Sequence, residues 1–129
     1  MSSNFVHLHV HSHYSLLDGL AKVDELVKAA KARGFSALAL TDHGNMYGAI
    51  EFYEQCLKNE IKPIIGMEAY VAPGSRFDKN GPDNKYHHLV LLAIDYNGYR
   101  NLMKLSSIAN LEGFYYKPRV DKEILKVPG

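Results

Sequence analysis

The alternation of short apolar runs with stretches of helical periodicity is the feature that most constrains the fold of this sequence. The apolar runs, each predicted to form a strand, are FVHLHV at residues 5–10, SALALT at 36–41, KPIIGMEAYVA at 62–72 and HHLVLLAI at 87–94. Helical spacing of apolar residues occupies residues 22–34, 48–58 and 97–111. Strands that alternate with helices at this spacing predict an α/β architecture built on βαβ crossovers.

The apolar positions within each helical stretch predict which of its faces is buried. The first stretch has Val23, Leu26, Val27 and Ala30 on one side, and the second has helical spacing at Ile50, Tyr53 and Leu57. The third is expected to turn Leu102, Leu105 and Ile108 inward. Gly34 suits the left-handed position that follows the end of a helix. The tail from residue 112 is expected to be irregular, with a short helix that starts near Asp121.

One junction breaks the alternation, because only a loop separates the third predicted strand from the fourth. Residues 73–85 contain glycine, proline and short polar residues but no apolar pattern. Parallel strands need a long crossover connection, usually a helix, so its absence predicts an antiparallel hairpin. The fourth strand would then start beside the end of the third strand, where Glu68 lies.

The segment HLHVHSHYS places a histidine at every second position from His7 to His13. On a strand, His7, His9 and His11 share one face, with neighbours about 6.6 Å apart. Two imidazoles at that separation can bind one metal ion or flank two, and imidazole is the commonest metal ligand. A polar strand face without metal is the alternative, and it is the weaker one where His-x-His stands next to further acidic residues.

Further side chains of the metal-binding type follow the other predicted strands. Parallel α/β folds place functional residues at the carboxyl ends of their strands. The predicted ligands are His9, His11, Asp18, His43, Glu68 and His88, the last of which joins the set only if the hairpin forms. Six nitrogen and oxygen ligands exceed the needs of one tetrahedral ion, so we expect at least two ions of zinc, manganese or iron. Paired ions suit phosphoester hydrolysis by a metal-activated water, and no separate protein base is assigned.

Other residues near these ligands have more than one interpretation. His7 is more simply a packed or hydrogen-bonded histidine, and His13 a surface residue of the turn. His87 and His88 are adjacent and point to opposite faces, so only one of them is expected to bind metal. Asp42 either caps the following helix or orients the histidine that comes after it.

Basic residues near the end of the chain are candidates for contact with a phosphate backbone. Lys117 and Arg119, with Tyr115 and Tyr116 before them, could bind substrate, or they could form a solvated basic segment with packed tyrosines. The net charge of +1 gives no argument of its own for nucleic-acid or membrane binding. A single cysteine, Cys56, excludes a disulfide framework, and no apolar run approaches transmembrane length, so we expect a cytoplasmic protein.

Five segments of the sequence, taken in order, resemble one known family. They are FVHLHVHSHYSLLDGLAKVDELV, ALALTDHGNMYGAIEFY, IKPIIGMEAYVAPGSR, HHLVLLAIDYNGYRNLMKLSS and EGFYYKPRVDKEIL. This set is similar to the PHP (polymerase and histidinol phosphatase) domain family, in the form found at the amino terminus of bacterial DNA polymerase III alpha subunits. The resemblance implies a distorted seven-stranded β/α barrel of the TIM type that holds two or three divalent ions of zinc, manganese, iron or magnesium. It assigns the metal ligands to the same six residues that the strand spacing selects.

The family's domain is longer than this chain, and its remaining ligands come from later strands. Residues 1–129 are therefore expected to form an incomplete PHP domain, the amino-terminal part of the barrel. An incomplete barrel leaves strand edges open, so we expect self-association through those edges and little hydrolysis by the chain alone.

For the full-length parent, the resemblance implies DNA replication with a metal-dependent 3′–5′ exonuclease of the proofreading type. Its partners would be DNA and other replicase subunits. One alternative is a non-catalytic PHP module that stabilises the polymerase or docks a proofreading subunit, and the intact ligand set argues against it. Another is a free-standing phosphatase of the histidinol-phosphate type, and the polymerase-like segment EGFYYKPRVDKEIL argues against that.

Overall fold

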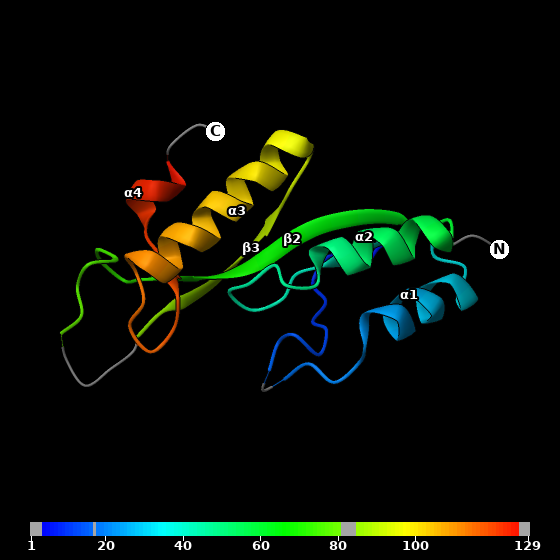
Figure 1. Cartoon of the computed structure of the whole chain (residues 1–129), viewed down its shortest axis with the longest axis horizontal. Helices are drawn as coiled ribbons and strands as arrows, with labels where there is room; N and C mark the ends of the chain where they lie inside the picture. The colour runs from blue at the N-terminus through cyan, green and yellow to red at the C-terminus, as the bar shows by residue number, and fades with distance from the viewer. Residues whose placement is uncertain (1–3, 17, 81–84, 127–129) are drawn as a thin grey trace.

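The computed structural model describes residues 4–16, 18–80 and 85–126 (Figure 1). Its elements in chain order are α1 (Val23–Ala32), β1 (Ala37–Leu40), α2 (Ala49–Lys58), β2 (Lys62–Val71), β3 (His87–Leu92), α3 (Tyr96–Leu111), β4 (Arg119–Val120) and α4 (Lys122–Leu125). These elements confirm three of the predicted strands, all three predicted helices and the short helix after Asp121. The predicted loop at 73–85 contains no helix or strand in its described residues, while residues 81–84 lie outside them.

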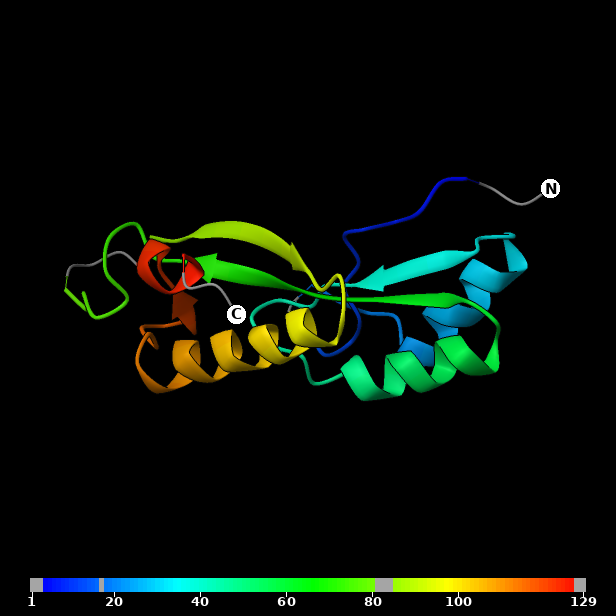
Figure 2. The ribbon, with the colours of Figure 1, turned by 90° about the horizontal axis from the view of Figure 1, so that it is seen from above.

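The sheet is organised around β2, the longest strand. Its first half pairs in parallel with β1, from Ala37 opposite Lys62 to Leu40 opposite Ile65. Its second half pairs antiparallel with β3 and, near its end, in parallel with β4. The antiparallel pairing of β2 with β3 confirms the hairpin predicted from the missing crossover helix. Figure 2 shows β2 running through both halves of the molecule, with α1, α2 and α3 on the same side of the sheet.

Two apolar clusters hold the helices against this sheet. The first lies between α1, α2 and β1 and includes Val23, Val27, Ala30, Leu38, Leu40, Phe52, Cys56 and Ile61. The second lies under α3 and includes Met67, Ala69, Val71, Ala109 and Val120. Because successive strand residues point to opposite faces, Glu68 and Tyr70 lie on the face of β2 that the helices do not cover. The same alternation therefore separates the apolar core from the polar face of the sheet.

The first predicted strand, residues 5–10, is wrong in detail. Residues 5–12 form no regular strand, although they run beside β1. Ala39 donates its amide to the carbonyl of His7 at 3.1 Å, and Thr41 donates to Val10 at 2.8 Å. Two steps along the chain, from Ala39 to Thr41, thus correspond to three steps from His7 to Val10, which is the count of a bulge. The amide of Val10 donates to the hydroxyl of Thr41 instead of to a backbone carbonyl, so no ladder forms.

On α2, the apolar residues whose spacing indicated a helix do not form the buried face. Ile50, Tyr53 and Leu57 are 67%, 49% and 56% exposed, whereas Phe52 and Cys56 on the other side of the helix are fully buried. Both sets have helical spacing, so periodicity does not decide which set packs on the sheet. Ile50 and Tyr53 of this exposed set border a groove of about 610 Å³ that also reaches the start of α3. For α1 the prediction is confirmed, with Val23, Val27 and Ala30 buried and Leu26 packed against them.

The ends of the helices follow ordinary capping chemistry. Gly34, with φ of 76°, takes the predicted left-handed position just after α1. Asp95 accepts a hydrogen bond from the amide of Gly98 at 2.9 Å and caps α3. Asp121 accepts one from Ile124 at 3.1 Å and caps α4. None of the helices seen in the described ranges has the length and apolar character needed to cross a membrane.

The described part of the sheet has four strands, and β3 pairs only with β2 there. The closed seven-stranded barrel and the self-association through an open strand edge therefore remain predictions. The architecture that the structure does show is a mixed α/β fold with one sheet and helices packed on one of its faces.

Candidate metal centre

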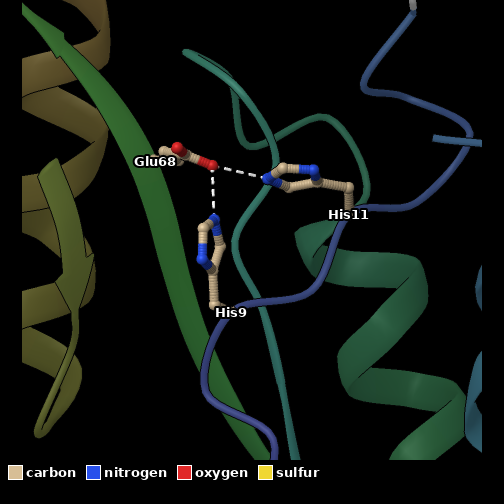
Figure 3. Close-up of side chains that lie close together, drawn as sticks. All are labelled: His9, His11 and Glu68. Carbon is tan, nitrogen blue, oxygen red and sulfur yellow. Dashed lines mark hydrogen bonds and ion pairs between the residues drawn. The ribbon is translucent and has the colours of Figure 1, made fainter. Parts of the chain in front are cut away.

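All six residues predicted as metal ligands lie together on the uncovered face of the sheet. They are His9 and His11 from the N-terminal segment, Asp18 from the following turn, His43 after β1, Glu68 on β2 and His88 on β3. Figure 3 shows the rings of two of these histidines directed at the carboxylate that β2 carries. The six side chains that the sequence pattern grouped thus lie close together, and their role as metal ligands stays a prediction.

Glu68 is the centre of this histidine cluster. Its Oε2 atom accepts hydrogen bonds from Nε2 of His9 at 2.6 Å and from Nε2 of His11 at 2.5 Å. Its Oε1 atom accepts one from Nδ1 of His88 at 2.9 Å. Burial alone would raise the pKa of Glu68, but the hydrogen bonds from these histidines and the charge of His43 lower it to about 2. The carboxylate is thus ionised at neutral pH although only 4% of the residue is exposed.

His43 lies between the two carboxylates of the cluster. Its Nε2 atom donates to Oδ2 of Asp18 at 2.6 Å, while its Nδ1 atom is 3.6 Å from Oε2 of Glu68. That Nδ1 atom is buried and has no hydrogen-bond partner within the described ranges. His11 also contacts Asp18, with 3.4 Å between Nδ1 and Oδ2. A buried ring nitrogen with no partner, directed at a carboxylate, suits the binding of a cation between them.

The backbone after β1 fixes His43 beside Glu68. The amide of Glu68 donates to the carbonyl of Asp42 at 3.0 Å, and the amide of Gly44 donates to the carbonyl of Glu68 at 2.9 Å. Gly44 has φ of 62°, and a Cβ at this position would lie 2.8 Å from the ring of Tyr70. Glycine is therefore needed both for the left-handed turn and for the close approach of that ring.

Asp42 has neither of the two roles predicted for it. It is buried, and its carboxylate accepts hydrogen bonds from the amide and hydroxyl of Ser12 at 2.6 and 2.8 Å and from the hydroxyl of Ser15 at 2.9 Å. The Ser15 hydroxyl in turn accepts the amide of His43 at 3.0 Å. Asp42 thus joins the turn after His11 to the turn that carries His43. Sequence reasoning missed both serines, whose only signal was their place inside the histidine-rich segment.

The comparisons with known proteins agree with this geometry. The sequence pattern of the family described as "PHP domain" matches residues 7–127. The chain belongs to the PHP domain family. This PHP chain is also similar to the N-terminal region of proteins described as DNA polymerase III subunit alpha. It is 56% identical to that of Aquifex aeolicus over the whole chain, and 59% identical to that of Treponema pallidum over 95% of it. It spans only 12% and 11% of the lengths of those two proteins.

Solved structures similar to the PHP chain support the same fold. An amidohydrolase from Chromobacterium violaceum, solved with bound sulfate and no metal, is 29% identical and has a TM-score of 0.61 over 81% of this chain and 32% of its own. A Bifidobacterium adolescentis protein described as a metal-dependent phosphoesterase has a TM-score of 0.59 over 84% of this chain and 34% of its own. Its identity is 16%, so this second likeness bears on the fold alone.

The other candidate histidines of the PHP chain lie away from the cluster or at its border. His7 packs between the rings of Phe5 and Phe35, with centroids 4.7 and 5.4 Å away. His13 packs against Tyr14, with ring centroids 4.2 Å apart and ring planes tilted by 35°, and is partly buried rather than at the surface. His87 is exposed on β3, on the strand face opposite to that of its neighbour. Each of the three lacks a contact with the two central carboxylates in the described structure.

The two predicted substrate-binding residues have different environments. Arg119 is buried, and its guanidinium donates to the carbonyls of Gly113, Arg76 and Asp78 at 3.0 to 3.1 Å. This placement counts against Arg119 as a substrate contact, because its donors are already used to join two loops. Lys117 remains partly exposed, with its Nζ atom 5.8 Å from the ring of Tyr70.

Aromatic rings that the sequence reasoning missed form one wall of the cluster. Tyr70 stacks on His43 with ring centroids 5.7 Å apart and meets His88 edge to face at 5.3 Å. Tyr86 stacks on His88 at 5.6 Å and contacts Tyr70 at 4.9 Å. Burial raises the pKa of Tyr70, and the nearby phenol of Tyr86 raises it further. The wall therefore holds two of the candidate ligand rings in fixed orientations.

The donor atoms fit divalent metal ions. Three overlapping groups have ligand atoms within 4.8 Å of one another: His9, His11 and Glu68; His11, Asp18 and His43; and His43, Glu68 and His88. Each group combines imidazole nitrogen with carboxylate oxygen, the donor set that zinc, manganese and iron accept. Consecutive groups share a residue, so ions held by them would be close neighbours.

Proposed function

We propose that this chain contributes a metal-dependent site for phosphoester hydrolysis to a DNA polymerase III alpha subunit. The observation that carries the proposal is the convergence of four imidazoles and two carboxylates into three overlapping groups of donor atoms. The similarity of the chain to DNA polymerase III alpha subunits of several bacteria supports the proposal that the full-length parent is such a subunit. DNA replication, with a 3′–5′ exonuclease that removes misincorporated nucleotides, is the role that joins these two observations.

Each of the six residues has a defined part in this proposal. His9, His11, Asp18, His43, Glu68 and His88 would hold two or three divalent ions. Bound ions of this kind lower the pKa of a coordinated water and offset the charge of a phosphoester oxygen. Glu68 is central because its two oxygens face different histidines and can therefore serve different ions.

The rest of the site keeps these groups in place before substrate arrives. Asp42, through the two serines that it contacts, joins the segment of His11 to the turn of His43. Tyr70 supports the ring of His43 from the side. A prearranged site loses little free energy to reorganisation when it binds a charged group. The parent's partners would be DNA and other replicase subunits, and replication would place the parent in the bacterial cytoplasm.

Metal analysis of matched histidine variants tests the metal site. The chain is stripped with a chelator, reloaded with manganese or zinc, and its bound metal is measured by elemental analysis. The double variant His9→Ala with His11→Ala should lose most of the bound metal, because two of the three donor groups contain one or both of these residues. The control His7→Ala with His87→Ala removes two exposed histidines outside the cluster and should bind as much metal as the unmodified chain.

Equal metal content in the two double variants would show that the assignment of His9 and His11 is wrong. The hydrolytic role is tested in the full-length parent, with a labelled single-stranded oligonucleotide as substrate. Release of 3′-terminal nucleotides that depends on His9 and His11 is expected. Metal binding without any such release would favour the non-catalytic module.

A further inference from the structure

The chain makes a tight turn after α3 and displays one aromatic side chain at its tip. The amide of Tyr115 donates to the carbonyl of Lys117 at 3.0 Å, which leaves Tyr116 at the apex. Tyr116 has φ of 62°, a left-handed conformation that a residue with a side chain adopts only at a cost in free energy. Its side chain is nevertheless 62% exposed, so burial of the ring does not offset that cost.

This turn lies against the histidine cluster. A Cβ added to Gly44 would be 3.1 Å from Pro118, so the end of the turn packs on the residue that follows His43. Lys117 places its ammonium 5.8 Å from the ring of Tyr70, and that ring stacks on His43 at 5.7 Å. Lys117 is therefore separated from the candidate ligands by one aromatic ring. It is a neighbour of the cluster and not a member of it.

The cationic and aromatic side chains of this region divide into two kinds. Arg119 is buried and donates to backbone carbonyls, and its guanidinium lies 5.2 Å from the ring of Tyr115. Lys117 forms no ion pair within the described parts of the chain, and its ammonium contacts only an aromatic face. Arg119 and Tyr115 thus stabilise the turn, while Tyr116 and Lys117 lie at the surface of the molecule.

We propose that the turn of residues 115–117 binds single-stranded DNA beside the metal cluster. Lys117 would contact the phosphate next to the one that is hydrolysed, and Tyr116 would stack on an adjacent base. The inference rests on the proposed phosphoester chemistry, and it specifies the substrate as a polynucleotide strand and not a small phosphate monoester.

Two physical arguments support a strand as the substrate. The Lys117 ammonium lies beside the ring of Tyr70 and not among the candidate ligands, so it is better placed for a second phosphate, such as the next one along a polynucleotide strand. Nucleic-acid sites that bind single strands without sequence preference combine such cations with aromatic rings on which bases stack. Tyr116 and Lys117 supply that combination from consecutive positions of one turn.

Binding of a fluorescein-labelled oligothymidylate, followed by anisotropy in a chelating buffer of low ionic strength, tests the proposal without hydrolysis. Lys117→Gln should weaken binding several-fold and reduce the slope of log affinity against log salt by about 0.7, the value for one phosphate contact on a single strand. Lys58→Gln is the matched control, since Lys58 is exposed on α2 and loses the same charge. It should leave both the affinity and the slope unchanged.

Tyr116→Gly tests the stacking contact in a variant that is expected to fold. Glycine adopts φ of 62° without strain, so this change should preserve or raise the melting temperature. The affinity for oligothymidylate should fall about tenfold, within the range for one base stacked on an aromatic ring. Tyr116→Phe should restore that affinity, and an abasic oligonucleotide should bind equally to Tyr116→Gly and to the unmodified chain.

The outcomes separate this inference from the metal assignment. Bound metal after reloading should be the same in Lys117→Gln, in Tyr116→Gly and in the unmodified chain. Equal effects of Lys117→Gln and Lys58→Gln, no measurable binding by the unmodified chain, or an unchanged affinity in Tyr116→Gly would each overturn the inference. The metal assignment is judged only from the histidine variants described above, so either proposal can fail while the other stands.

Discussion

Arg76 and Glu68 are both buried, each at the centre of a polar cluster, and the two clusters differ in the source of their countercharge. Arg76 donates to Glu112 at 2.8 Å, to Asp121 at 3.1 Å and to Glu123 at 2.9 Å. A guanidinium carries a permanent charge, so the chain itself supplies the cation that these carboxylates contact. The side chains that contact Glu68 are imidazoles, which are charged only when protonated.

The comparison shows how similar residue types can serve stability in one region and binding in another. In the Arg76 cluster, the cation and the anions are all side chains of the chain, so the cluster forms without a bound ion. In the histidine cluster, two carboxylates meet imidazoles, which carry no permanent charge, and one buried nitrogen of His43 has no partner among the described atoms. The first cluster stabilises the loops around α4, while the second is suited to a cation from solution.

The largest expected loss of stability follows from removing the Asp121 carboxylate, which contacts Arg76. Asp121→Ala removes the acceptor of the Arg76 amide and guanidinium as well as the cap of α4. The free energy of unfolding should fall by about 3 kcal/mol, because a buried ion pair is broken on one side. The measurement is urea unfolding followed by circular dichroism.

Asp95→Ala provides the matched control for Asp121→Ala. Asp95 also caps a helix, but it is exposed and contacts no arginine in the described structure. Its removal should cost about 1 kcal/mol, the ordinary value of a lost cap. Equal losses in the two variants would mean that the Arg76 cluster adds nothing beyond the cap and that the contrast between the clusters is wrong.

Added metal should stabilise the folded chain against unfolding only by binding at the histidine cluster. A divalent ion at a hundred times its dissociation constant stabilises a folded protein by about 2.7 kcal/mol. We expect a rise of this order when manganese or zinc is added to the unmodified chain and to Asp95→Ala, measured by thermal unfolding. Glu68→Gln should abolish most of the rise, because Glu68 belongs to two of the three donor groups. An undiminished rise in Glu68→Gln would place the metal elsewhere.

The smallest expected effect is the pH dependence that Asp121 contributes. Burial tends to raise the pKa of Asp121, but hydrogen bonds from the amides of Arg76 and Ile124 and the Arg76 guanidinium lower it below the usual 3.8. The unfolded chain then binds more protons than the folded chain in this range. The stabilisation by Asp121 is therefore complete above the usual pKa of an aspartate. It is lost as the pH falls through the lowered pKa of the folded chain.

A pH series of unfolding experiments isolates this contribution. The unmodified chain should lose stability more steeply below pH 3.8 than Asp121→Asn does, since the variant has no carboxyl group to protonate. The difference between the two curves removes the contributions of all other acidic groups. Parallel curves in this range would contradict the lowered pKa of Asp121.

The sequence by itself determined which residues could meet at the cluster. The spacing of two residues grouped His9 with His11, although their segment forms no regular strand, and the loop without a crossover helix implied the hairpin that brings His88 to Glu68. Both predictions depend on local rules, the period of a strand and the length of a connection, and such rules are readable in one dimension. The resemblance to the PHP family rested on the same segments and is confirmed by the family match.

Only the tertiary structure decided between residues whose local patterns were equivalent. Periodicity did not reveal that Phe52, and not Tyr53, packs on the sheet, because both belong to stripes of helical spacing. Charge and position did not separate Lys117 from Arg119 until the backbone carbonyls around Arg119 were known. In each case the deciding partner is distant in sequence.

Asp42, within the site itself, is another residue whose hydrogen-bond partners could not be predicted from the sequence. An aspartate before a histidine and a helix fits the pattern of a helix cap or of an acceptor that orients the histidine ring, and both interpretations use neighbours in sequence. The actual partners, Ser12 and Ser15, are 30 and 27 residues away. Burial makes those contacts obligatory, because a buried carboxylate needs hydrogen-bond donors, and only the folded chain determines which donors are within reach.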